Sequence, residues 1–217
     1  MLIAVVFSCG ILVLAQDLSL LPKYGSLPKN NEQKAADSTF ISVMDEQYQG
    51  DRNKASHQVV ARGWQYLKQG DLPDAMRRFN QAWLLNNGNG DALWGMAAIQ
   101  ASLGKSDESL KLFAEAEKYV GRDVNFSVDY AKAIGTAGIE KHDETLLKDA
   151  FNRFEHIFQE APQNTNNLQN WAITLAAEGR YSEAWTKVKM AERTPDRKAL
   201  DPRFLADLQA RMPRPHD

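Results

Sequence analysis

The sequence has little of what supports catalysis or nucleic-acid binding. It has one cysteine in 217 residues, Cys9, so a chain shortened past this position would have neither a disulfide nor a thiol site. The net charge is −2 and the pI is about 6.1, whereas a nucleic-acid-binding protein usually has a strongly basic face. No HExxH, P-loop, GxSxG or Rossmann glycine pattern occurs. We therefore expect a non-enzymatic protein that has no cofactor or metal and binds no nucleic acid.

Isolated polar motifs do not change this expectation. The four histidines do not pair at metal-ligand spacing, and His156 with Glu160 one turn later is typical of a solvated pair on a helix. Asn87, Asn89 and Asp91 alternate as calcium ligands do, but a calcium loop needs several carboxylates and a bidentate Glu. We interpret this stretch as a turn between two helices.

Long apolar runs are missing except at the N-terminus. Residues 2–15 form an uncharged apolar run of fourteen residues, whereas a bilayer-spanning helix needs roughly 20 residues. The run is typical of a secretory signal peptide at 1–15, and the small residues Val13 and Ala15 predict cleavage before Gln16. A lipoprotein signal ending at Cys9, or a retained anchor, is the alternative. We expect an exported protein that is periplasmic or envelope-associated.

Residues 16–50 differ from the rest of the chain. Prolines and glycine punctuate the first part, which predicts a loop. From Asn31 to Tyr48 the apolar residues recur every four positions, at Ala36, Phe40, Met44 and Tyr48, which predicts one amphipathic helix. We expect this helix to cover the start of the following domain. The alternative is a free tail that folds only on a partner.

Beyond Asp51 the sequence repeats itself with a period of 34 residues. Small residues, glycines and aromatics recur at this spacing, as Gly63, Ala97 and Ala131, as Gly70, Gly104 and Gly138, and as Phe79 and Phe113. A further copy, with Ala172 and Gly179 at the corresponding sites, is in register only if about seven residues are inserted. We assign the insertion to Gly138–Glu144, where we expect it to lengthen the loop between two helices.

This pattern resembles the tetratricopeptide repeat (TPR), a helix-turn-helix unit of 34 residues. The resemblance covers residues 56–211 and implies an all-α fold. The expected architecture is a right-handed α-solenoid of about four hairpins, with an N-terminal helix and a C-terminal capping helix. We expect a TPR domain at 51–213, with repeats near 56–89, 90–123, 124–164 and 165–198 and the capping helix at 202–211.

The resemblance also implies a concave groove lined by the first helix of each hairpin. The partner-binding residues expected there are Trp64, Lys68, Asp91, Trp94, Asn125, Lys132 and Gln169. The two tryptophans are the leading candidates because tryptophan is enriched among binding hot spots. The alternative is that the N-terminal helix covers them. The other tryptophans, Trp83, Trp171 and Trp185, are expected in the core.

From these features we expect a scaffold or assembly adaptor of the cell envelope that binds a protein or peptide partner in its groove. The alternative is a structural, oligomerising protein whose groove is filled by its own N-terminal segment. A homo-oligomer and a membrane association through the N-terminus remain open.

Overall fold

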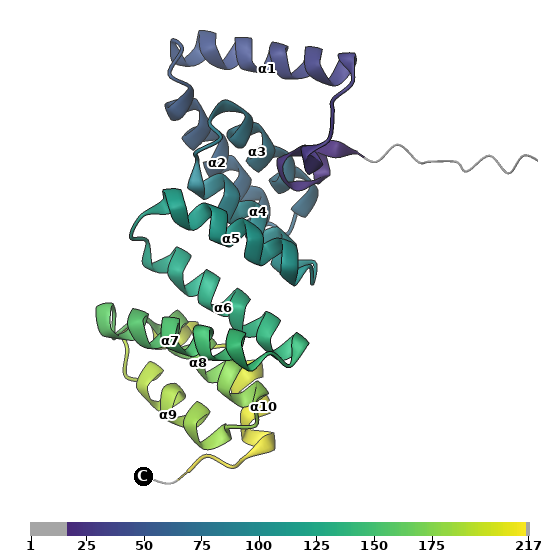
Figure 1. Cartoon of the computed structure of the whole chain (residues 1–217). Coiled ribbons are helices and arrows are strands. Elements are labelled where there is room, and N and C mark those ends of the chain that lie inside the picture. Colours follow the sequence, from purple (N-terminus) through teal and green to yellow (C-terminus); the bar gives the residue numbers. More distant parts are fainter. Residues whose placement is uncertain (1–16, 216–217) are drawn as a thin grey trace, which may run out of the picture.

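The computed structural model describes residues 17–215, which form an all-α solenoid (Figure 1). The expected leader and Cys9 lie outside the described residues. The α-helices are α1 (Asn31–Tyr48), α2 (Arg52–Lys68), α3 (Leu72–Leu85), α4 (Gly90–Ser102), α5 (Ser106–Val120), α6 (Val124–Lys141), α7 (Glu144–Glu160), α8 (Thr165–Ala177), α9 (Tyr181–Ala191) and α10 (Pro202–Arg211). Three short 3₁₀ segments, η1 (Leu18–Leu20), η2 (Pro22–Ser26) and η3 (Arg197–Ala199), complete the described chain.

Helices α2 to α9 pair into four hairpins that stack along the chain, so the predicted TPR-like fold is confirmed. We call α2, α4, α6 and α8 the first helices and α3, α5, α7 and α9 the second helices. Glycine closes three of the hairpin turns in the left-handed conformation that favours it, with φ of 80° at Gly70, 70° at Gly104 and 75° at Gly179.

Small residues let the helices approach closely around the buried ring of Phe79. A Cβ atom on Gly63 would lie 2.6 Å from this ring, and one on Gly95 would lie 2.2 Å from it. Ala97, at the site that corresponds to Gly63 one repeat later, is fully buried. The glycines on α2 and α4 thus create the space that the aromatic side chain of α3 fills.

The third hairpin does not have the long loop that we expected at Gly138–Glu144. Helix α6 continues to Lys141 and α7 begins at Glu144, so only two residues separate the helices. Gly138 lies inside α6, where a Cβ atom would come within 2.9 Å of Leu147 on α7. His142 takes the left-handed conformation instead, with φ of 52°, and the inserted residues lengthen the helices.

Helix α1 covers the open end of the first hairpin. Its Met44 is buried, and Phe40 and Ile41 pack partly against the core, whereas Ala36 is exposed. Asn30 and Gln33 form a reciprocal capping box that begins the helix. The predicted helix is therefore present, and it is folded against the solenoid in the isolated chain.

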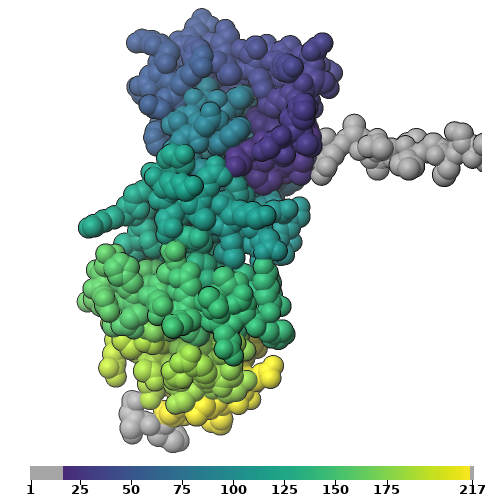
Figure 2. All heavy atoms as spheres, viewed as in Figure 1, coloured from purple at the N-terminus to yellow at the C-terminus, as the bar shows by residue number. Residues whose placement is uncertain are grey.

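Residues Asp17–Ser26, which we call the strap, precede α1 and lie beside α3 and α5. Figure 2 shows these purple residues packed against the neighbouring helices, and the backbone passes alongside α3 in Figure 1. Lys23, Tyr24, Gly25 and Ser26 all have positive φ. A non-glycine residue in this conformation costs roughly 1–2 kcal/mol, so local backbone hydrogen bonds and contacts with the helices must together hold the turn in place.

Helix α10 covers the other end of the stack, as predicted. Leu208 is 1% exposed, and the indole Nε1 of Trp185 on α9 donates to the carbonyl oxygen of Met212 at 3.0 Å. Trp171 and Trp185 are buried and Trp83 packs partly against the core, in agreement with the sequence. Between residues 17 and 215, no helix is both long and apolar enough to span a bilayer.

Candidate functional site

The two tryptophans proposed for the groove form one row with two phenylalanines. Trp64 on α2 contacts Phe79 edge-on at 5.3 Å between ring centroids, and it contacts Trp94 on α4 at 4.9 Å. Trp94 in turn contacts Phe126 on α6 at 5.6 Å. Both tryptophans are only partly exposed. They therefore join three successive first helices, and only part of each ring is exposed.

Trp94 also forms a hydrogen bond with a carboxylate that was not among the site residues predicted from the sequence. Its Nε1 donates to Oδ2 of Asp129 on α6 at 3.0 Å. Burial raises the pKa of the Asp129 carboxyl above its ordinary value, although the Trp94 hydrogen bond and the nearby Lys132 oppose that rise. A carboxylate whose pKa is perturbed by burial is more often found at functional sites than elsewhere.

Asp129 opens onto a pocket between α4, α5 and α6, which we call the central pocket. Its volume is about 330 Å³. The lining is mostly small residues, with one aromatic side chain and two charged groups: Ala98, Ala101, Ser102, Ser106, Ser109, Phe113, Asp129, Lys132, Ala133 and Thr136. An apolar hollow with a few polar groups at defined places is the usual form of a ligand site.

Of the predicted site residues, Lys132 lines the central pocket and Trp94 is joined to it through Asp129. Lys68 is exposed in the last turn of α2, and Asn125 is exposed in the first turn of α6. Gln169 on α8 accepts the backbone N–H of Asp201 through its Oε1 at 2.6 Å, so this oxygen holds the start of α10.

Asp91, in the first turn of α4, lies among charged neighbours. Burial raises the pKa of its carboxyl, His57 opposes the rise and Asp123 adds to it. Asp123 has the same effect on Asp129. Three carboxylates on or beside α4 and α6 are therefore close enough to affect one another, and Lys132 is a positive charge near Asp129.

His156 and Glu160 lie 3.6 Å apart with both side chains largely exposed, as expected for a solvated pair. Among the described residues, no three His, Cys, Asp or Glu side chains are grouped so that they could hold a metal ion.

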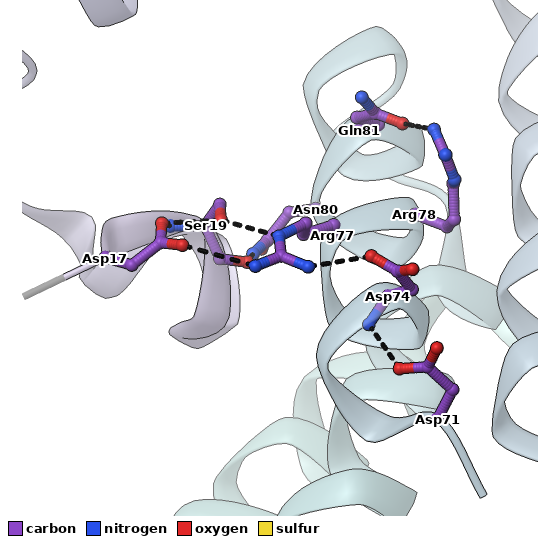
Figure 3. A network of polar contacts seen from close by, with 8 residues as sticks. All are labelled: Asp17, Ser19, Asp71, Asp74, Arg77, Arg78, Asn80 and Gln81. Carbon is purple, nitrogen blue, oxygen red and sulfur yellow. Dashed lines mark hydrogen bonds and ion pairs between the residues drawn. The ribbon is translucent and has the colours of Figure 1, made fainter.

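The strap contacts the second helices rather than the central pocket. Its hydrogen bonds and ion pairs run to Arg77 and Asn80 on α3 and to Glu115 on α5. Figure 3 shows Arg77 between Asp17 and Ser19 on one side and Asp74 on the other. The alternative in which the N-terminal segment fills the groove has no support from residues 17–48.

Comparisons with known proteins agree with this fold. Residues 66–125 match the family model of the tetratricopeptide repeat. A thermophilic TPR protein of Thermus thermophilus is 19% identical with a TM-score of 0.63, over 73% of this chain and 84% of that protein. YrrB, described as a TPR protein with an unusual peptide-binding site, is 12% identical with a TM-score of 0.51, over 78% and 92% of the two chains. A search of curated protein sequences finds no match. The chain thus contains a tetratricopeptide-repeat segment within a TPR-like solenoid.

Proposed function

We propose that this chain is a non-catalytic scaffold that binds a peptide or helix of a partner protein across the central pocket. The observation that carries the proposal is the pocket itself, with Lys132 and the half-buried Asp129 on a lining of small side chains. TPR scaffolds typically bind peptides and proteins, and YrrB is described as having a peptide-binding site. Small side chains leave room for an incoming backbone, and the charged pair gives direction to its binding.

We further propose that the protein works in the cell envelope as an assembly factor or adaptor. This part depends on the apolar run at 2–15, which resembles a secretory signal. Fractionation of the native cells, with sequencing of the mature N-terminus, tests it independently of partner binding. Recovery of the protein in the cytoplasm with an uncleaved N-terminus would contradict an envelope role.

Site-specific photocrosslinking in the native cells tests the pocket. A photoreactive residue at Ala101, on the exposed rim, should capture a partner protein, whereas the same residue at Ala114, exposed on α5 outside the pocket, should not. Ala98→Trp should fill the pocket and remove the crosslink at Ala101. Equal capture from both positions, or capture that survives Ala98→Trp, would show that partners bind elsewhere.

A further inference from the structure

A second site with the geometry of peptide recognition lies between α3 and α5, centred on Asn80. The Asn80 side chain is fully buried, and its three hydrogen bonds run to the backbone of the strap. Its Nδ2 donates to the carbonyl oxygens of Ser19 and Leu21, both at 2.8 Å. Its Oδ1 accepts the backbone N–H of Tyr24 at 3.4 Å. One amide group thus contacts three backbone groups of an irregular segment, and the Tyr24 N–H also donates to the Leu21 carbonyl oxygen within the strap at 3.0 Å.

Charged groups fix both ends of the strap on this site. At one end Arg77 donates to Asp17 Oδ2 at 3.4 Å and to the Ser19 hydroxyl at 3.3 Å, as Figure 3 shows. At the other end Lys23 Nζ lies 2.7 Å from Glu115 Oε2 on α5. The site therefore matches an extended segment with an acidic residue six positions before a basic one, and it joins the first two hairpins.

The strap has the features of a bound peptide more than those of a core element. None of its residues reaches the fully buried state of the helices beneath it. Hollows of about 220 and 340 Å³ lie along its two edges. Its turn at Lys23–Ser26 has left-handed backbone, which local backbone hydrogen bonds and contacts with the surrounding residues hold in place. Segments with few buried apolar contacts open at low free-energy cost.

We propose that the groove between α3 and α5 is a peptide-binding site which the strap fills as an intramolecular ligand, and that the strap of a second copy of this chain can take its place. The incoming strap would form the same three hydrogen bonds with Asn80 and the same ion pairs with Arg77 and Glu115. Because the covalently attached strap is always present at high local concentration, exchange requires that it first be loosened.

Binding of a fluorescent peptide with the sequence of residues 17–30 to the full chain tests this proposal. Reversing the charges at both ends, in the variant Asp17→Lys/Lys23→Glu, loosens the attached strap and leaves every receptor residue unchanged. We expect this variant to bind the peptide at least tenfold more tightly than the wild-type chain does. Adding Asn80→Ala should remove that binding, and adding Asn152→Ala, at an exposed position of α7, should not.

Hydrogen exchange of the strap amides in the same variants shows whether the attached strap has been loosened. If these amides exchange freely and the peptide still does not bind, the groove is not a peptide site. Binding that persists after Asn80→Ala would also overturn the proposal. Circular dichroism and thermal unfolding of the Asn80→Ala variants establish that the hairpins remain folded.

Discussion

At the scale of single residues, the groove combines positions that the repeat pattern reveals with one that it does not. Trp64 and Trp94 lie on the first helices of successive repeats, so their common face could be predicted. Asp129 could not, because its hydrogen bond with Trp94 joins side chains of two different helices, α4 and α6, and the repeat spacing does not specify such a contact. The available signal was a single charged residue between the buried Val128 and Tyr130. A charged residue between two buried apolar residues of a helix is a functional candidate.

The half-buried carboxylate of Asp129 should lower the stability of the protein at neutral pH. Its pKa is raised in the folded state, so the folded state binds this proton more tightly than the unfolded state. The free energy of unfolding therefore falls as pH rises from the ordinary pKa of an aspartate through the raised value. Asp129→Asn keeps an acceptor for Trp94, and we expect it to raise the unfolding temperature at pH 7 and to have little effect near pH 3.

Asp107→Asn is the control with the opposite sign. The hydrogen bond from Lys141 lowers the pKa of the Asp107 carboxyl, so its ionised form stabilises the folded state above the ordinary pKa, and that contribution is lost as pH falls through the lowered pKa. Its replacement should lower the unfolding temperature at pH 7 by a small amount, because the group is exposed. Thermal unfolding followed by circular dichroism at both pH values measures the two variants. Equal shifts of the same sign would contradict the assigned environments.

At the scale of elements, the helices were predictable where caps and periodicity agree. The apolar residues spaced by four predicted α1, and α3 begins directly after its N-cap residue Asp71, with Pro73 in the first turn. The turn of the third hairpin was not predictable from the 34-residue period, because glycine can have either of two structural roles. At Gly104 it supplies a positive φ, whereas at Gly138 it permits close contact with Leu147. The useful signal for the turn was Asp143, whose carboxylate caps α7.

The turn between α6 and α7 predicts that glycine stabilises the protein at His142. His142 has a φ of 52°, where a Cβ atom is unfavourable. His142→Gly should raise the free energy of unfolding by about 0.5–1 kcal/mol, because relief of this strain exceeds the entropy that glycine adds to the unfolded chain. His156→Gly, at an exposed position inside α7, should lower it by about 1 kcal/mol.

Urea denaturation of these two variants and the wild-type chain tests the prediction. The two changes are chemically identical and lie in the same hairpin, so only the backbone conformation distinguishes them. A loss of stability for His142→Gly similar to that for His156→Gly would show that the turn is not left-handed. It would also favour the longer loop that the repeat pattern predicted between α6 and α7.

At the scale of the whole molecule, the hairpins of the solenoid pack mainly against their neighbours along the chain. Each hairpin packs on the next, α1 covers one end and α10 covers the other. In such a linear array, stability is approximately a sum of repeat and interface contributions. The sequence predicted this arrangement through its period and its two end helices. It did not predict that the strap joins α3 to α5, because that contact depends on hydrogen bonds from Asn80 to backbone atoms.

This linear arrangement predicts that weaker packing of the C-terminal cap lowers the stability of only the nearby helices. Leu208 of α10 is 1% exposed, so Leu208→Ala should lower the free energy of unfolding of that end by about 2–5 kcal/mol. Hydrogen exchange should increase first in α8 to α10, whereas the amides of α2 to α5, which include two helices that line the central pocket, should remain protected. Leu103→Ala, where the side chain is 51% exposed, should leave exchange at both ends unchanged. An equal loss of protection along the whole chain in Leu208→Ala would mean that the hairpins unfold as one unit. The stability of the central pocket would then depend on both end helices rather than on the helices next to it.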